Sequence, residues 1–266
     1  MEPVLLVRYA EIHLKGLNRP YFERALVAEI EKALPQHHVR VVREQGRIFV
    51  WNVPADALYE AADRLTRVFG IHSVSPAFAT EKDFEAIVAA ATAVMRDTLA
   101  DACKDTCTFK VVARRADKQF PMRSQEICAE LGGRMLEAFP ALSVDVHRPA
   151  IRLGAEIRQQ QAFVYAKELM GLGGMPVGCN GHGMLLISGG IDSPVAGYMI
   201  AKRGVRLSAV HFYSYPYTSE RARDKVVELL GIVARSTGPI RLFLVPFTDI
   251  QLAIYENCPD SETTIL

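Results

Sequence analysis

A hexapeptide of small and polar residues, Ser188-Gly189-Gly190-Ile191-Asp192-Ser193, has the composition of a phosphate-binding turn. The apolar run 184–187 before it predicts a short buried strand, and Pro194 after it suits the first turn of a helix. A strand-to-helix turn points several backbone N–H groups at one spot, and the helix dipole adds partial positive charge there. The two glycines let the backbone approach a phosphate closely, and the two serines add hydroxyl donors. The segment therefore predicts a site for a phosphorylated ligand.

The hexapeptide contains no cation of its own. A Walker-type loop carries a Lys before a Ser or Thr, and this segment has none. The charge of a bound pyrophosphate must therefore be met by Mg²⁺ or by a basic residue from elsewhere. Asp192 could hold such a metal, because hard carboxylate oxygen suits Mg²⁺. The alternative is a plain Gly-Gly turn with Asp192 as a helix N-cap, but the whole hexapeptide at this junction favours the phosphate site.

The elements that position this loop alternate between strands and helices. We expect strands at 184–187, 207–212 and 242–247, and helices at 194–203, 219–235 and from Thr248 onward. This βαβαβα order predicts a parallel sheet. Doubly wound sheets usually contain two such halves, so we expect this domain, and with it the sequence, to be incomplete.

Two α+β units are expected before the parallel sheet. The first has strands at 4–9, 39–43, 47–51 and 71–77, with helices at 18–34 and 54–69, which is a split βαβ, ferredoxin-like order with 39–43 and 47–51 as a hairpin. The second has helices at 83–102 and 124–139, and strands at 108–114, 144–147, 151–157 and 162–167, the last two as a hairpin. A glycine-rich stretch, 171–183, is typical of a linker. The predicted boundaries are 1–77, 78–170, 171–183 and 184–266.

Composition narrows the class of protein. Half of the 266 residues are hydrophobic and 23% are charged, which is typical of a globular protein. The net charge of +1 gives no global sign of nucleic acid, so any RNA site must be a local patch. The five cysteines lack paired zinc spacing. No signal peptide or membrane span is predicted, so we expect a cytoplasmic protein without membrane association.

Several motifs of the chain resemble one family closely. Ser188 to Ser193 looks like the PP-loop of the ATP pyrophosphatase superfamily. The further motifs of the resemblance are Val7-Arg8-Tyr9, Leu14 to Arg19, Arg114 to Lys118, Phe120-Pro121, Leu172 to Gly178, Leu186 to Gly197, Lys202-Arg203-Gly204 and His211-Phe212. Together they resemble the tRNA 4-thiouridine synthetase (tRNA sulfurtransferase) family over essentially the whole sequence.

The resemblance implies a fold and a nucleotide site. It implies an α+β part, made of a ferredoxin-like domain and a THUMP RNA-binding domain, followed by an α/β parallel-sheet PP-loop ATP pyrophosphatase domain, here incomplete. It implies Asp192 as a catalytic residue and Mg²⁺ ligand. The implied ATP contacts are Leu186, Ile187, Ser188, Gly189, Gly190, Asp192, Ser193, His211 and Phe212. Taken alone, His211 could equally be a packed strand-end residue.

The implied reaction is the ATP-dependent conversion of a tRNA uridine to 4-thiouridine. The uridine C4 oxygen attacks the α-phosphate of ATP, and pyrophosphate leaves into the loop. A protein-bound persulfide, supplied by a cysteine desulfurase, then delivers sulfur to C4 and AMP leaves. The resemblance also suggests a homodimer and a link to thiamine thiazole synthesis.

The basic residues of the same motifs are the candidates for tRNA contact. They are Lys15, Asn18, Arg19, Arg114, Arg115, Lys118 and Arg123. Such groups would neutralise phosphates, and the alternative is a solvated charged face.

The chain departs from the family pattern in two places. The persulfide cysteine of the family falls beyond Leu266, and none of the five cysteines, Cys258 included, matches it. Ala10 stands where the family more often has Gly. We expect little consequence from Ala10, but we expect this chain alone to be inactive, because the second half of the PP-loop domain is missing. The alternatives are a tRNA-binding fragment without chemistry, or another PP-loop RNA-modifying enzyme, such as a lysidine synthetase.

Overall fold

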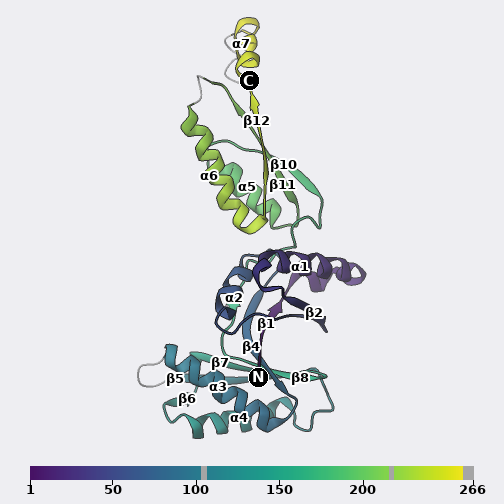
Figure 1. Ribbon diagram of the computed structural model, residues 1–266, viewed down its shortest axis with the longest axis vertical. Coiled ribbons are helices and arrows are strands. Elements are labelled where there is room, and N and C mark those ends of the chain that lie inside the picture. The colour runs from purple at the N-terminus through teal and green to yellow at the C-terminus, as the bar shows by residue number, and fades with distance from the viewer. Residues whose placement is uncertain (103–106, 216–218, 260–266) are drawn as a thin grey trace. The chain divides into compact units, whose positions relative to one another are not determined.

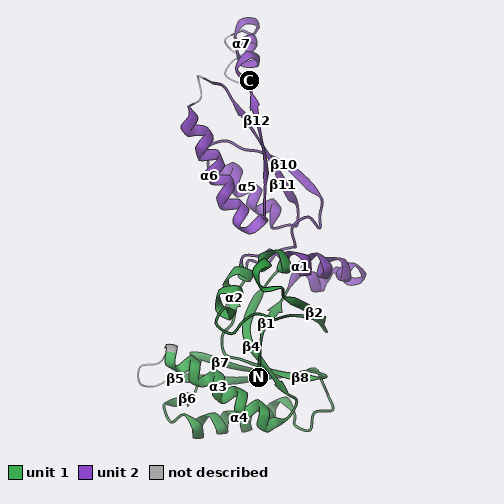
Figure 2. Ribbon diagram, in the orientation of Figure 1, with its two compact units in different colours: residues 1–9, 30–66, 71–171 green, residues 10–29, 67–70, 172–266 purple. Residues whose placement is uncertain are grey.

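The structure is a computed structural model that describes residues 1–102, 107–215 and 219–259 (Figure 1). Cys103, one of the five cysteines, and the last seven residues of the predicted parallel-sheet domain, 260–266, lie outside the described residues. Packing divides the chain into unit 1, residues 1–9, 30–66 and 71–171, and unit 2, residues 10–29, 67–70 and 172–266 (Figure 2). No helix in the described part of the chain is long and apolar enough to cross a bilayer.

Unit 1 is built on one nine-stranded sheet with the order β2-β3-β1-β4-β8-β7-β5-β6, and β9 pairs with β4. The strands are β1 (Glu2–Arg8), β2 (Arg40–Glu44), β3 (Arg47–Trp51), β4 (Ser73–Glu81), β5 (Cys107–Arg115), β6 (Leu142–Val144), β7 (Ile151–Ile157), β8 (Gln161–Tyr165) and β9 (Leu169–Met170). The helices are α2 (Leu58–Thr66), α3 (Phe84–Ala102) and α4 (Ser124–Ala138), with a short 3-10 helix, η2 (Pro35–His37). Both predicted hairpins, β2–β3 and β7–β8, are confirmed as antiparallel pairs.

Strand β4 joins what the sequence presents as two separate units. It pairs along its length with β1 on one side, and with β8 and β9 on the other. The sequence predicted only 71–77 for this strand, but it continues to Glu81. Pro76 is tolerated inside the sheet because it falls between the β9 ladder, which ends at Val74, and the β8 ladder, which begins at Phe78. The predicted ferredoxin-like unit and the predicted α+β unit that follows it therefore share one continuous sheet.

Unit 2 contains the predicted parallel sheet, in the order β10-β11-β12. Its strands are β10 (His182–Leu186), β11 (Arg206–Tyr213) and β12 (Arg241–Pro246), and its helices include α5 (Asp192–Ala201), α6 (Glu220–Thr237) and α7 (Thr248–Asn257). Helix α6 buries Val226, Leu230 and Val233 at helical spacing, and the Ser219 hydroxyl accepts from the Ala222 N–H at its start. The strand and helix order of this segment is as the sequence predicted.

Parts of the predicted first domain belong to unit 2. A 3-10 helix that the sequence did not indicate, η1 (Glu11–Asn18), precedes α1 (Arg19–Ala33), and α1 is divided between the units. Within unit 2, Phe69 packs in one cluster with Val177, Ala201 and Leu207. The Arg203 guanidinium lies 2.7 Å from the Glu11 carboxylate.

The glycine-rich stretch predicted as a linker, 171–183, is packed within unit 2 from Leu172 onward. Gly173 and Gly174 have φ of +67° and +82°, a region that L-residues rarely adopt. The Met175 N–H donates to the Lys202 carbonyl at 2.9 Å, and the Gly178 N–H donates to the Gly204 carbonyl at 2.8 Å. The stretch is thereby fixed to the end of α5.

The two glycines provide a matched pair for testing this packing. A Cβ at Gly174 would collide with the carbonyl oxygen of Lys202, whereas nothing lies within 4 Å of a Cβ at Gly173. Gly173→Ala should cost about 1 kcal/mol, for the left-handed backbone alone. Gly174→Ala should cost roughly 1–3 kcal/mol more, because the collision is added. Urea denaturation followed by circular dichroism compares them, and equal midpoints for the two variants would contradict this packing.

Candidate functional site

The predicted phosphate loop, residues 188–193, begins after the carboxyl end of β10 and runs into the first turn of α5. Ile187 is buried, and its N–H donates to the Val210 carbonyl at 2.9 Å, which extends the β10–β11 pairing up to the loop. The Ser188 N–H donates to Ser193 Oγ, and the Gly190 N–H donates to Ser188 Oγ, each at 3.3 Å. Both serine hydroxyls therefore hold the loop in shape as acceptors, and their own O–H groups are still donors.

His211 braces this loop from β11. Its Nδ1 lies 2.9 Å from the Ile187 carbonyl oxygen, a hydrogen bond when Nδ1 carries the proton. The side chain is only 9% exposed. The sequence left His211 open between a packed residue and a ligand contact, and the structure shows its ring buried against the carbonyl of Ile187, the residue before the loop.

Two apolar side chains stand exposed at the same sheet edge. Leu186, which ends β10, is 67% exposed, and Phe212 of β11 is 46% exposed. Phe212 packs edge-to-face against Phe247, with ring centroids 5.5 Å apart. Both side chains are therefore accessible to a ligand at the carboxyl end of the parallel strands.

Asp192 is the first residue of α5, and its side chain is exposed. Ile191, not Asp192, occupies the N-cap position, so the capping alternative does not describe this residue. The described residues contain no group of three or more His, Cys, Asp or Glu side chains that could enclose a metal ion. A single carboxylate fits Mg²⁺ only where phosphate oxygens and water supply the remaining ligands.

Lys225 is a basic side chain beside the loop, whose own sequence contains no cation. It is exposed on α6, and its Cδ lies 3.7 Å from the position of a Cβ at Gly189. No described carboxylate pairs with its ammonium group. Lys225 comes 32 positions after Ser193 in the sequence. The sequence does not predict this contact, because the two segments meet only in the folded chain.

A cavity of about 570 Å³ opens on the sheet of unit 1. Its charged lining consists of Arg8, Arg47, Arg114, Arg152, Lys167 and Glu168. Arg114 is the one residue of the predicted tRNA set within this lining. The excess of cations makes the cavity a candidate anion site, formed by strands from both halves of the continuous sheet.

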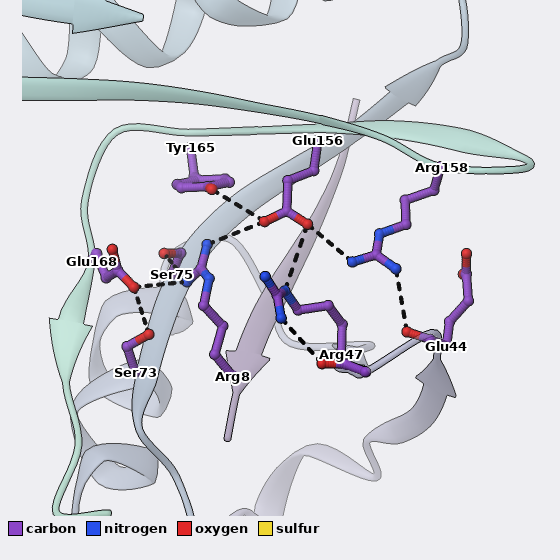
Figure 3. Close-up of polar contacts among 10 residues, drawn as sticks. Arg8, Glu44, Arg47, Ser73, Ser75, Glu156, Arg158, Tyr165 and Glu168 are labelled. Carbon is purple, nitrogen blue, oxygen red and sulfur yellow. Dashed lines mark hydrogen bonds and ion pairs between the residues drawn. The ribbon is translucent and has the colours of Figure 1, made fainter. Parts of the chain in front are cut away.

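Beneath the cavity, a buried carboxylate holds three guanidinium groups together (Figure 3). Glu156 of β7 is 2% exposed, and its oxygens lie 3.6 Å from Arg8, 3.7 Å from Arg47 and 3.0 Å from Arg158. The Tyr165 hydroxyl donates to it at 3.3 Å. Burial alone would raise the pKa of Glu156, but the charges of the three arginines outweigh that effect and hold the pKa below the ordinary 4.5.

The remaining predicted tRNA residues have diverse surroundings. Arg115 donates through Nη1 to the Phe120 and Met122 carbonyls, both at 2.9 Å, so its guanidinium organises the turn after β5. Lys118 and Arg123 are exposed on the segment between β5 and α4.

Three of the predicted tRNA residues lie in unit 2, at the join of η1 and α1. The Lys15 ammonium lies 5.0 Å from the centre of the Phe22 ring, and Arg19 pairs with Glu23 at 2.8 Å. Asn18 is exposed at the end of η1.

Three family models match the chain in series: the ThiI ferredoxin-like domain over residues 4–75, the THUMP domain over 81–167, and the thiamine biosynthesis protein ThiI over 178–266. A probable tRNA sulfurtransferase of Acetivibrio thermocellus is 49% identical over 270 residues, which cover 100% of this chain and 68% of the relative. The chain belongs to the ThiI family of tRNA sulfurtransferases. The predicted family and the predicted order of fold types are thereby confirmed, whereas the predicted boundaries stay predictions.

A further curated relative and two solved structures are also similar to this chain. A probable tRNA sulfurtransferase of Lachnospira eligens is 50% identical, over 100% of this chain and 68% of its own length. A crystal structure of a 4-thiouridine synthetase–RNA complex with bound ATP matches with a TM-score of 0.90 at 37% identity, covering 100% of this chain and 67% of that one. A Pyrococcus horikoshii protein matches with a TM-score of 0.81 at 32% identity, over 96% and 82%. This chain thus spans about two thirds of the length of its curated ThiI relatives.

The Glu156 cluster generates a stability prediction for the ThiI chain. Glu156→Gln removes the negative charge and leaves three buried guanidinium groups facing one another, which should cost about 3–5 kcal/mol. Because the folded pKa of Glu156 lies below its unfolded value, the carboxylate stabilises the fold above about pH 4.5, and this stability is lost as the pH falls through the folded pKa.

The measurement is urea unfolding between pH 3 and 7. Wild type should lose stability toward low pH more steeply than Glu156→Gln. Glu60→Gln is the matched control, because Glu60 is an exposed partner of Arg64 and should cost less than about 1 kcal/mol. A Glu156→Gln protein with wild-type midpoints at every pH would refute the role of the cluster.

Proposed function

We propose that this chain is the tRNA- and ATP-binding part of an enzyme that transfers sulfur to a tRNA uridine, giving 4-thiouridine. The observation that carries the proposal is the loop 188–193 at the carboxyl end of a parallel strand, with Lys225 beside Gly189. The names of the relatives, tRNA sulfurtransferases, and the RNA and ATP in the matching crystal structure support the same substrates.

ATP is proposed to lie along this edge of the sheet. The backbone N–H groups of the loop and the start of α5 would hold its phosphates, and the ammonium of Lys225 would offset their charge. Mg²⁺ would be shared between phosphate oxygens and Asp192. The exposed Leu186 and Phe212 would contact the adenine. In this arrangement His211 acts indirectly, since it fixes the Ile187 carbonyl and thereby the start of the loop.

The proposed chemistry has two displacements. The uridine C4 oxygen bonds to the α-phosphorus of ATP and the bond to pyrophosphate breaks, so C4 carries an adenylate as leaving group. The terminal sulfur of a protein persulfide, loaded by a cysteine desulfurase, then bonds to C4 and AMP leaves. The product is finally released when a thiol bonds to the protein sulfur, forming a disulfide, and the sulfur–sulfur bond to the C4 sulfur breaks, which leaves 4-thiouridine. The loop and Lys225 would stabilise the charge that develops on pyrophosphate in the first displacement.

The basic cavity of unit 1 is proposed to bind the tRNA backbone. Its five cations provide the sequence-independent part of RNA affinity, and Arg114 and Arg152 are exposed within its lining. A protein that grips tRNA without chemistry is the second candidate, because the cavity and the loop belong to different units. A homodimer and a contribution of sulfur to thiazole synthesis stay predictions.

Loop variants separate chemistry from RNA binding. In the enzyme at its native length, Asp192→Ala and Lys225→Met should each lower 4-thiouridine formation by at least about 100-fold, since each removes charge compensation at the reacting phosphates. Affinity for tRNA should stay within about twofold of wild type. Arg221→Met, an equal charge loss on the exposed side of α6, is the control and should thiolate normally. Normal 4-thiouridine yield from Asp192→Ala would rule out the proposed nucleotide site.

Substitutions in the cavity should affect tRNA binding, in contrast to the loop variants. Arg114→Ala and Arg152→Ala should weaken tRNA binding, and each should reduce the slope of log affinity against log salt by about 1 for one lost phosphate contact. Arg64→Ala, which removes an exposed arginine paired with Glu60 on α2, should leave the slope unchanged. Filter binding at several salt concentrations measures this. Unchanged slopes for both cavity variants would place the RNA elsewhere.

A further inference from the structure

The basic cavity contains one acidic side chain, Glu168, among the described residues that line it. A carboxylate beside five cations weakens the attraction for phosphate, because it repels the same charge that the cations attract. Unlike Glu156, it is not enclosed by the fold, since its side chain is 45% exposed. A site that served only to attract phosphate would be stronger without it.

Glu168 is held in a defined orientation from one side only. Its Oε1 accepts from Ser73 Oγ at 2.5 Å and lies 3.3 Å from Arg8 Nη1 (Figure 3). Arg8 is itself fixed, because it donates to Ser75 Oγ at 2.9 Å and stacks 4.8 Å from the centre of the Tyr165 ring. In the described part of the chain, no hydrogen bond reaches the second oxygen, Oε2. Glu168 thus presents a preorganised acceptor to the cavity.

The lining favours the sugar–phosphate backbone over the bases. Its tyrosines, Tyr9 and Tyr165, are buried, and Arg8 covers the Tyr165 ring, so neither offers a face for stacking. The donor that the RNA backbone carries, next to each phosphate, is the ribose 2′-hydroxyl. An ionised carboxylate accepts a hydroxyl hydrogen bond strongly. The donor that competes with the 2′-hydroxyl is the amino group of a base, if that base stacks on the exposed ring of His72.

We propose that Glu168 accepts a hydrogen bond from a ribose 2′-hydroxyl and so selects RNA over DNA in the basic cavity. This inference rests on the proposed binding of tRNA there. The cations of the cavity hold either nucleic acid by its phosphates, whereas Oε2 is satisfied only by RNA. A DNA backbone bound in the same place would shield Oε2 from water without offering it a donor, which adds discrimination against DNA.

The test is a double-mutant cycle that combines substitution of Glu168 with replacement of single 2′-hydroxyls in a tRNA transcript. Single riboses are replaced by 2′-fluoro nucleotides, which keep the sugar pucker of RNA but carry no O–H donor. With wild-type protein, one position should show about tenfold weaker binding. With Glu168→Ala, the same replacement should change affinity by less than about twofold. Glu137→Ala, an exposed glutamate of α4, is the control and should retain the full effect.

Other outcomes would overturn the inference. Glu168→Ala and Glu168→Gln could tighten binding of every RNA equally, with the 2′-fluoro effect intact, and Glu168 would then be only a repulsive charge. If the loss of affinity depends on the base at that position and not on its sugar, Glu168 contacts a base amino group instead. Failure of wild-type protein to bind any tRNA would instead refute the proposed function. Circular dichroism of both variants checks their folding.

Discussion

The buried contact between Glu156 and three arginines is the interaction on which unit 1 depends. Its members come from β1, β3 and the β7–β8 hairpin, so the charges join strands from both halves of the continuous sheet. One carboxylate cannot neutralise three guanidinium groups, and the cluster keeps a net positive charge. Arg8 and Arg47 extend from it into the lining of the cavity. The interaction that ties the two halves together therefore also creates the field that would attract a phosphate backbone.

Unit 2 is subject to a different constraint. The turn 188–193 must keep its shape while its backbone N–H groups point toward a ligand. The serines at both ends of the hexapeptide accept hydrogen bonds from N–H groups inside it, and His211 fixes the carbonyl that precedes it. The loop is thus supported from β11 and from its own hydroxyls. Binding of an anion would then need little rearrangement, which is the condition under which aligned dipoles stabilise developing charge most.

The sequence allowed prediction of those features whose cause is local. The hexapeptide, the two hairpins and the βαβαβα order follow from glycine placement, apolar runs and turn residues near one another in the chain. The pairing of β4 with β8 could not be predicted, because alternation along a strand does not specify which strand lies beside it. Lys225 and the cavity arginines other than Arg114 were missed for the same reason. Gly189 meets Lys225, and Arg8 meets Glu156, only after the chain has folded.

The near-zero net charge of the chain explains why its basic groups must be gathered so tightly. With a total of +1, these 266 residues exert little long-range attraction on nucleic acid. Beyond roughly 8 Å, screening at physiological salt removes most of what remains. RNA would therefore be held where several cations converge within that distance, as they do around Glu156. Such an arrangement does not favour rapid, non-specific binding of nucleic acid. Affinity depends instead on the shape of one cavity. A single carboxylate such as Glu168 can then influence which nucleic acid binds there.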